Sequence, residues 1–157
     1  LELKVLALDC HYLSRQDLAD AFKTEGLSYG DKDHLAGRQR IAGAIFNTSV
    51  DLTHPLTFSL TRDTLPVFKN STWLLEASDA PFVNILTYTK RPLLAGFTDS
   101  VNVEQVAEGA GLIAHSYGRG SVIAMTDNPV FRGYWYGTSR LLSNALFLGH
   151  TFRASGQ

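Results

Sequence analysis

The residues that could perform acid–base or metal chemistry are few and widely spaced. The five histidines are His11, His34, His54, His115 and His150, and none is followed by a glutamate three residues later. The sequence has no HExxH motif either, so the ligand spacings typical of zinc peptidases are missing. We therefore expect this chain to bind no zinc and no other cofactor.

The single cysteine is the other candidate for chemistry. Cys10 stands beside His11 in the stretch LDCHY, and neighbouring residues of a strand point to opposite faces. A nucleophile elbow also needs glycines two residues before and two after the nucleophile, which Cys10 lacks. We expect no elbow and no nucleophilic catalysis. One cysteine cannot form an internal disulfide.

Two acid–base pairs are close in sequence: Asp51 with His54, and Asp99 with Glu104. Nothing in the sequence places either pair in a shared cleft, and Asp51 can accept hydrogen bonds from the following amides, as in an Asx-turn. Pro55 favours an extended His54. We therefore favour side chains that stabilise turns.

An aromatic loop is the remaining candidate. Arg132, Tyr134, Trp135 and Tyr136 crowd together after Phe131, and aromatic residues with arginine are enriched at interaction hot spots. The alternative is that some of these rings fill the core. We expect Phe131 to turn inward and Trp135 and Tyr136 to lie at the rim. Arg132 should fold onto a carboxylate, with Asp127 and Asp51 the nearest, or onto backbone carbonyls, because an unpaired buried guanidinium is costly.

The elements that must position these residues follow from local patterns. Residues 1–8 suit a buried strand or the tail of a helix, 15–25 a helix ended by Gly26, and 27–39 a loop. Strands are expected over 40–48, 66–68, 72–77, 82–89 and 93–97. A short helix over 103–108 should be capped by Asn102, and Gly118 to Gly120 should join strands 111–117 and 121–126 as a hairpin, not as a phosphate loop.

The last helix has the clearest signal. Thr138 should cap it, Gly149 should end it, and Leu141, Leu142, Ala145 and Leu146 should form its buried face. Helices at both ends with short strands between them predict an α/β fold with a mixed β-sheet flanked by helices. No repeat or linker divides the chain, so we expect a single domain over 1–157.

The composition and charge of the chain exclude some classes of function. The chain has 157 residues, of which 45% are hydrophobic and 18% charged, and its formal net charge is −1. These values are typical of a globular domain and exclude a basic nucleic-acid surface. No apolar run is long enough to span a bilayer, so we expect no membrane insertion. The start at Leu1, without methionine or a signal peptide, suggests a fragment of a longer protein.

Four segments carry a family resemblance. They are IAGAIFNTSVDLTHPLTF, RDTLPVFKN, KRPLLAGF and GRGSVIAMTDNPVFRGYWYGTSRLLSNALFLG, which together span about 41–149. They resemble the C-terminal part of bacterial zinc carboxypeptidase-like proteins, where a domain similar to class I glutamine amidotransferases follows a carboxypeptidase A-like metallopeptidase domain. The family's catalytic residues lie in the peptidase domain, and the cysteine elbow and His-x-Glu pair of working amidotransferases have no match at Cys10 or near the C-terminus here.

The resemblance implies a non-catalytic accessory domain of an exported, periplasmic or extracellular, zinc carboxypeptidase. Its partner would be its own N-terminal peptidase domain, which would hold the zinc, and the amidotransferase-like fold would begin part-way, leaving sheet edges open to self-association. One alternative is a stand-alone peptide- or glycan-binding module that uses loop 131–137. Another is a hydrolase or amidotransferase with an unrecognised site.

Overall fold

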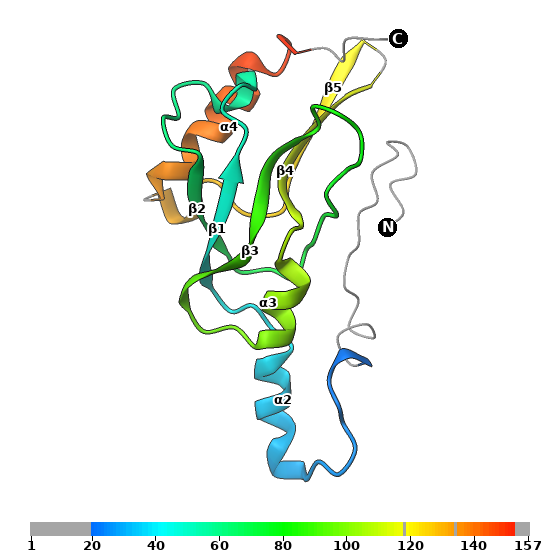
Figure 1. Ribbon diagram of the computed structural model, residues 1–157. Coiled ribbons are helices and arrows are strands. Elements are labelled where there is room, and N and C mark those ends of the chain that lie inside the picture. Colours follow the sequence, from blue (N-terminus) through cyan, green and yellow to red (C-terminus); the bar gives the residue numbers. More distant parts are fainter. Residues whose placement is uncertain (1–19, 118, 134, 153–157) are drawn as a thin grey trace.

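The computed structural model describes residues 20–117, 119–133 and 135–152 (Figure 1). These residues form an α/β arrangement of one five-stranded sheet and three α-helices, with three short 3-10 turns. The sheet curls around the longest helix (Figure 1). The expected strand at 1–8 lies outside the described residues.

Every neighbouring pair of strands in the sheet is antiparallel. The strands are β1 (Ala44–Val50), β2 (Thr64–Lys69), β3 (Asn84–Gly96), β4 (Ala110–Tyr117) and β5 (Gly120–Met125). Their order across the sheet is β2-β1-β3-β4-β5, so β2 and β5 are the edges.

The expectation of a mixed sheet was wrong for the described residues. A parallel pair needs a crossover that returns across one face of the sheet, and this crossover is usually a helix. The only α-helix between two consecutive strands is α3 (Ser100–Val106), which has seven residues. It lies at one end of the sheet and not across a face (Figure 1). The chain therefore reverses direction at three of the four connections, whereas the connection from β2 to β3 passes β1 and keeps the strand direction, without making the two strands neighbours.

Helix α4 (Tyr136–Leu148) covers one face of the sheet from edge to edge. A Cβ placed on Gly137 would lie 3.7 Å from Leu65 Cδ1 of β2. At the other end, the Ser121 hydroxyl of β5 donates to the Gly149 carbonyl at 2.6 Å. The helix thus fixes the curvature of the sheet by contacting both of its edge strands.

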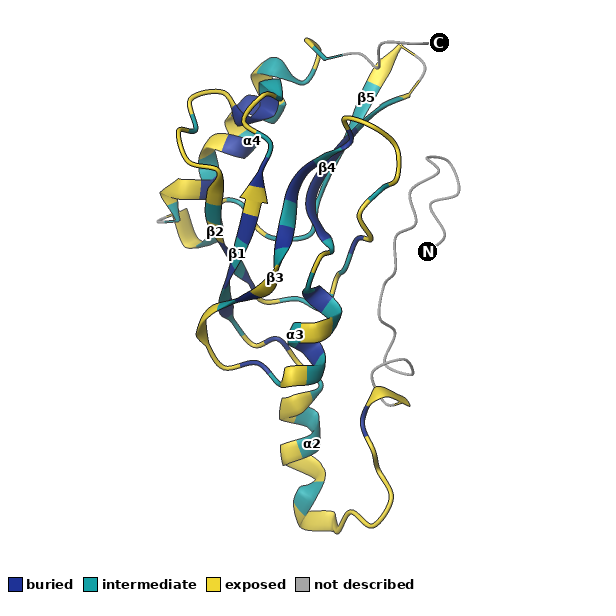
Figure 2. Ribbon diagram, viewed as in Figure 1, coloured by how far each residue is buried: buried dark blue, intermediate teal, exposed yellow. Residues whose placement is uncertain are grey.

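The main core lies between this helix and the sheet, and burial follows it along the central strands (Figure 2). Its largest members include Phe46, Leu86, Tyr88, Leu112 and Leu141. A smaller cluster of Leu75, Val83, Ala110 and Ile113 lies apart from it. Residues of β4 belong to both clusters, so this strand is buried on both faces.

A buried asparagine fastens α4 to the turn η2 (Pro55–Thr57). Asn144 Nδ2 donates to the Leu56 carbonyl at 2.8 Å and to the Phe58 carbonyl at 2.9 Å. The side chain is only 6% exposed, and burial of a polar group is tolerated because both bonds are made. A hydrogen-bonded polar group therefore occupies the helix face where leucines were expected.

The buried face of α4 is rotated from the one expected. Leu141 is 2% exposed, whereas Leu146 is 73% exposed, because five residues turn the helix by about 140°. Thr138 lies inside the helix, where its hydroxyl donates to the Pro129 carbonyl, and it is not the N-cap. The N-cap position is Trp135, three residues before the expected Thr138, and Gly149 ends the helix as predicted.

Segment 27–39, expected as a loop, contains η1 (Tyr29–Asp31) and α2 (Lys32–Arg38). None of the residues of α2 is buried. The helix therefore lacks the repeating apolar residues by which a sequence pattern could have predicted it. It extends from the end of the sheet beside α3 (Figure 1). Two contacts hold its last residue: Arg38 Nε donates to Asp99 at 2.7 Å, and Asn102 Nδ2 donates to the Arg38 carbonyl.

The two strands expected at 82–89 and 93–97 are one strand, β3, with a bulge between them. Phe46 pairs with Leu93 and Thr48 pairs with Tyr88, so the register shifts where Pro92 enters the strand. Proline cannot donate to a sheet ladder and is tolerated at bulges. Pro92 led us to expect two strands, but the strand continues past this proline through the bulge.

Three other expectations needed correction. Residues 72–77 form no strand but only isolated bridge positions at Trp73 and Leu75, the latter pairing with Ala110. The helix expected at 103–108 is α3, whose cap is Asp99 and not Asn102, because the Asp99 carboxylate accepts from the Val101 amide. Of the helix expected at 15–25, the described part is helical only at 20–21. The strand expected at 40–48 is shifted to β1, while strand 66–68 and the hairpin were confirmed.

The packing of α4 gives the first testable prediction. Leu141→Ala removes a buried side chain and should lower the free energy of unfolding by about 2–5 kcal/mol. Leu146→Ala, on the same helix, should change it by less than about 0.5 kcal/mol, because its side chain already contacts water. Urea denaturation of the two variants measures both values. Equal losses would mean that the helix is rotated from the position described.

Candidate functional site

The most concentrated set of buried ionisable groups lies where three distant segments meet. Lys69 is the last residue of β2, Tyr88 lies in the middle of β3, and Asp127 follows β5. Lys69 is fully buried, and the Asp127 side chain is 10% exposed. Such a group of ionisable side chains is a natural first candidate for chemistry.

Each polar atom of this set has a partner. Lys69 Nζ lies 3.0 Å from Asp127 Oδ1 and donates to the Trp73 carbonyl at 2.8 Å. The Tyr88 hydroxyl donates to Asp127 Oδ2 and lies 3.3 Å from the Thr126 hydroxyl. The ammonium also lies 5.6 Å from the centre of the Tyr88 ring, a cation–π distance.

Burial dominates the electrostatics of these three groups. It lowers the pKa of Lys69, although the Asp127 charge opposes the shift. Burial likewise raises the pKa of Asp127, against the attraction of Lys69 and the hydrogen bond from Tyr88. The pKa of Tyr88 is raised well above its ordinary value by burial and then by the Asp127 charge. Each charge is therefore tolerated because its partner is present.

The set has almost no room for a substrate. The adjoining cavity has a volume of about 20 Å³ and is lined mainly by apolar residues such as Val67, Leu86 and Leu112, with Asp127 at its wall. That volume suits at most one water molecule. The arrangement therefore ties the end of β2 to the chain that follows β5, which is a structural role.

A double-mutant cycle tests this role. Lys69→Met should destabilise the fold by about 3–5 kcal/mol, because Asp127 is left as an uncompensated buried charge. Asp127→Asn should destabilise the fold in the same way, because it leaves Lys69 as the uncompensated buried charge. The double variant should lose less than the sum, since neither charge remains.

The matched control for that cycle is Lys90→Met. Lys90 is 86% exposed and lies 3.9 Å from Glu108, so its loss should cost under about 0.5 kcal/mol. Denaturation midpoints of the four proteins and the control provide the measurement. Strictly additive losses at Lys69 and Asp127 would show that the pair does not act as a unit.

The aromatic loop has an inner and an outer side. The Phe131 ring stacks on Phe68 of β2, with ring centres 3.9 Å apart, and Trp135 lies half-buried with its ring 6.4 Å from Phe68. Tyr136 is 78% exposed. The inward Phe131 and the outward Tyr136 agree with the expectation for this loop. Trp135 lies further in than expected, because its Nε1 is shielded from water, and Tyr134 lies outside the described residues.

The expected carboxylate partner of Arg132 was wrong. Asp127 is engaged by Lys69 and Tyr88, and Asp51 accepts from Thr53. The guanidinium of Arg132 lies instead over the Phe131 ring, 5.2 Å from its centre. The residue is exposed, so the penalty for an unpaired buried charge does not arise.

Both candidate acid–base pairs stabilise turns. Asp51 Oδ1 accepts from the Thr53 amide at 2.9 Å, and His54 Nδ1 accepts from the Leu56 amide at 3.1 Å while its ring packs on Phe152. In the second pair, Asp99 caps α3. Arg38, whose side chain bonds to Asp99, lowers the pKa of that carboxyl. The hydrogen bonds of Asp51, His54 and Asp99 agree with the favoured interpretation.

The position of His54 predicts a pH dependence. Burial lowers the pKa of His54 below its ordinary value of 6.5, although the Asp51 charge opposes the shift. As the pH falls through 6.5, the unfolded chain therefore takes up this proton before the folded chain, and stability decreases. Protonation also removes the acceptor for the Leu56 amide.

The variant His54→Asn should retain the cap and lose the titration, because asparagine accepts the same kind of hydrogen bond. Denaturation between about pH 7.5 and about pH 5 should therefore cost the parent more stability than the variant. Equal pH slopes for the two proteins would contradict the assignment.

One serine pattern was missed by the sequence analysis. Residues 26–30 read GLSYG, which matches GxSxG around Ser28. Among the described residues before it there is no strand, and Ser28 has a φ of −83° as the cap of η1. Its hydroxyl donates to Asp31 Oδ2 at 2.7 Å, so it faces a carboxylate and not an imidazole base. The strand–turn–helix setting of an elbow is therefore missing here.

The remaining metal and nucleophile candidates do not converge. Within the part of the chain that the structure describes, no three of the His, Cys, Asp and Glu side chains are grouped as metal ligands would be. Cys10 and His11 lie outside that part. In the same residues, no helix combines the length and apolarity needed to cross a bilayer.

The sequence analysis did not single out Lys69, Tyr88 or Asn144. One signal could have found the first: Lys69 shares the alternation of Leu65 and Val67, which places it on the buried face of the strand. Asp127 was considered only as a partner for Arg132. No local signal pairs it with Lys69, 58 residues away.

Comparison with known proteins finds no matching family model, no matching curated protein and no matching solved structure. The resemblance to zinc carboxypeptidase-like proteins therefore rests on the sequence segments alone.

Proposed function

We propose that this chain is a non-catalytic accessory domain that packs on a neighbouring domain of the same polypeptide. In this proposal the neighbour is the metallopeptidase domain of an exported zinc carboxypeptidase, and the zinc belongs to that domain. The amidotransferase-like fold is part of the same hypothesis. The sequence resemblance motivates it, and the loop at the start of α4 supports it.

The supporting observation is the division of that loop into an anchored side and an exposed side. The stack of Phe131 on Phe68 fixes the loop to β2, so Arg132 and Tyr136 are held outward without needing to be ordered by a partner. Preorganised aromatic and arginine side chains lose little entropy on binding. Arg132, Trp135 and Tyr136, which we call the rim, have the composition of a contact surface.

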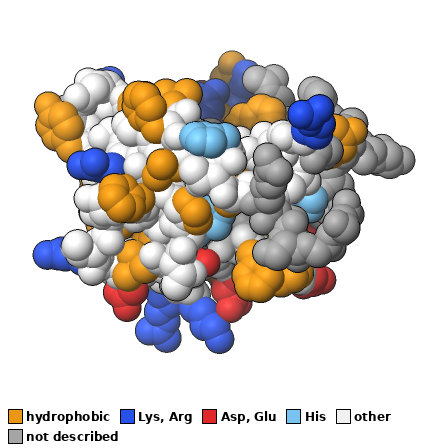
Figure 3. Space-filling view, turned by 90° about the horizontal axis from the view of Figure 1, so that it is seen from above, with side chains coloured by type: hydrophobic (Ala, Val, Ile, Leu, Met, Phe, Trp, Pro, Cys, Tyr) orange, Lys and Arg blue, Asp and Glu red, His pale blue; other side chains and the backbone are white. Residues whose placement is uncertain are grey.

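Other exposed apolar side chains form a less coherent surface. Phe58, Leu146 and Phe147 are 68%, 73% and 74% exposed at the other end of α4. Viewed from that end, hydrophobic side chains stand apart from one another among polar atoms (Figure 3). Apolar residues scattered in this way are normal on a protein surface. They serve better as controls than as the contact itself.

The test compares this chain with the longer polypeptide that the proposal requires. Arg132→Ala with Tyr136→Ala should leave the stability of the isolated chain within about 0.5 kcal/mol. In the longer protein, the same change should increase amide hydrogen exchange at the contact. The control, Phe147→Ala, should change neither.

An unfolded double variant would show that the rim belongs to the core. Unchanged exchange in the longer protein would remove the rim as the interface. A stand-alone binding module using loop 131–137 would then be favoured only if the isolated chain bound a peptide or glycan and lost that binding in the double variant.

A further inference from the structure

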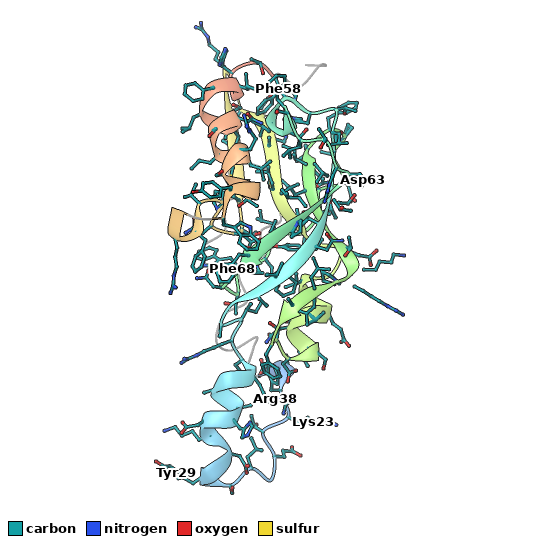
Figure 4. All side chains as sticks on the ribbon, turned by 90° about the vertical axis from the view of Figure 1, so that its left-hand side faces the viewer. Lys23, Tyr29, Arg38, Phe58, Asp63 and Phe68 are labelled. Carbon is teal, nitrogen blue, oxygen red and sulfur yellow. The ribbon has the colours of Figure 1, made fainter. Side chains whose placement is uncertain are left out.

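A groove of about 320 Å³ lies where β2 begins, between the preceding loop and the first turn of α4. Its lining includes Ser59, Thr61, Arg62, Thr64, Leu65 and Gly137. This volume falls in the range of small-molecule sites. Figure 4 looks onto this edge, with the residues of the loop and strand running between the labelled Phe58 and Phe68.

The charge of the groove has one sign. Arg62 is the only charged residue in its lining, and no lining residue is acidic. In the described part of the chain, the ion pairs join Arg38 to Asp99, Lys69 to Asp127 and Lys90 to Glu108. Arg62 takes part in none of them, so its planar fork of donors is available to an anion.

Asp63 follows Arg62 directly but does not line the groove.

The uncharged part of the groove has two kinds of surface. Three hydroxyl groups, of Ser59, Thr61 and Thr64, belong to its lining, and Leu60, Leu65 and Pro66 provide apolar area. A simple inorganic anion would use the arginine and the hydroxyls but leave the apolar area in contact with water. A ligand with an anionic group beside an apolar group would use both.

The backbone of β2 argues against a bound strand. The Val50 amide donates to the Asp63 carbonyl, so by antiparallel alternation Leu65 turns its backbone groups toward β1 and Pro66 turns its own to the open edge. Proline has no N–H to offer there and blunts an edge strand. Side chains, and not β-strand addition, must therefore provide recognition.

We propose that this groove binds a small organic carboxylate, with the carboxylate on Arg62 and an apolar substituent on Leu60, Leu65 and Pro66. The hydroxyls of Ser59, Thr61 and Thr64 complete the polar side. The site adjoins the rim, because Gly137 follows Tyr136, but it shares no residue with the rim and does not depend on the proposed accessory function.

The probe is N-acetyl-leucine, and its matched neutral control is N-acetyl-leucine amide. Titration of the whole chain, followed by amide chemical shifts, should move the resonances of 59–65 and Gly137 with the acid but far less with the amide. Inorganic phosphate distinguishes an anion site from a carboxylate site, because it lacks the apolar group. We expect phosphate to bind more weakly than N-acetyl-leucine.

The variants test the role assigned to Arg62. Arg62→Gln should weaken binding of N-acetyl-leucine about tenfold. Arg140→Gln removes the same charge from an exposed residue of α4 that does not line the groove, and it should leave the affinity within about twofold. Both substitutions are at exposed positions, so neither should unfold the chain, and unchanged far-ultraviolet circular dichroism confirms this.

Three outcomes would overturn the proposal. They are shifts that occur away from the groove, equal binding of the acid and the amide, and equal losses in the two variants. Phosphate binding as tight as that of N-acetyl-leucine would reduce the site to a general anion site and would also contradict it. Loss of the rim contact in the accessory-domain test would leave all of these results unaffected.

Discussion

The buried pair of Lys69 and Asp127 is the contact on which the rest of the described structure depends. It joins the end of edge strand β2 to the residue that starts the connection from β5 to α4, while Tyr88 joins both to the central strand β3. A pair of this kind adds little net stability, because desolvation offsets most of the attraction. Its effect is specificity: any packing that separates the two segments leaves a charge buried and unpaired. The connection it fixes also carries Phe131 and Trp135 and delivers the chain to α4.

The same strand supports the two proposed contact surfaces. At its end, Phe68 supports the aromatic loop through Phe131. At its beginning, Thr64 and Leu65 form one wall of the groove. A strand of six residues thus supports both the rim and the groove, which adjoin where Gly137 follows Tyr136, and the ion pair at Lys69 fixes the end of this strand. The two surfaces therefore share one rigid support.

The sequence predicted the features that depend on neighbouring residues and missed those that depend on contacts between distant residues. The hairpin of β4 and β5 and the end of α4 at Gly149 follow from local patterns, and the structure has them. The cap of α3 was misplaced because Asp99 and Asn102 are both good caps, and only the fold decides that Asn102 is needed inside to bind the Arg38 carbonyl.

The rotation of α4 has the same kind of cause. A hydrophobic pattern counts Asn144 as a polar, outward residue. It turns inward because it donates to the carbonyl of Leu56 in η2 and to that of Phe58 just after it. The candidate sites were even less predictable from local sequence patterns. The roles of Lys69 and Arg62 depend on which carboxylates the fold brings near them, and no local spacing contains that information.

The two sheet edges differ in how they could meet another chain, which bears on the expected self-association. At β2, Pro66 removes a donor from the open edge. The other edge, β5, has the sequence GSVIAM, with no proline and no charge, and in the described residues it pairs only with β4. Short apolar edges without charge or proline are the ones prone to pairing. If two copies associate through their sheets, the contact is therefore expected at β5, on the opposite edge of the sheet from the groove and from Phe68.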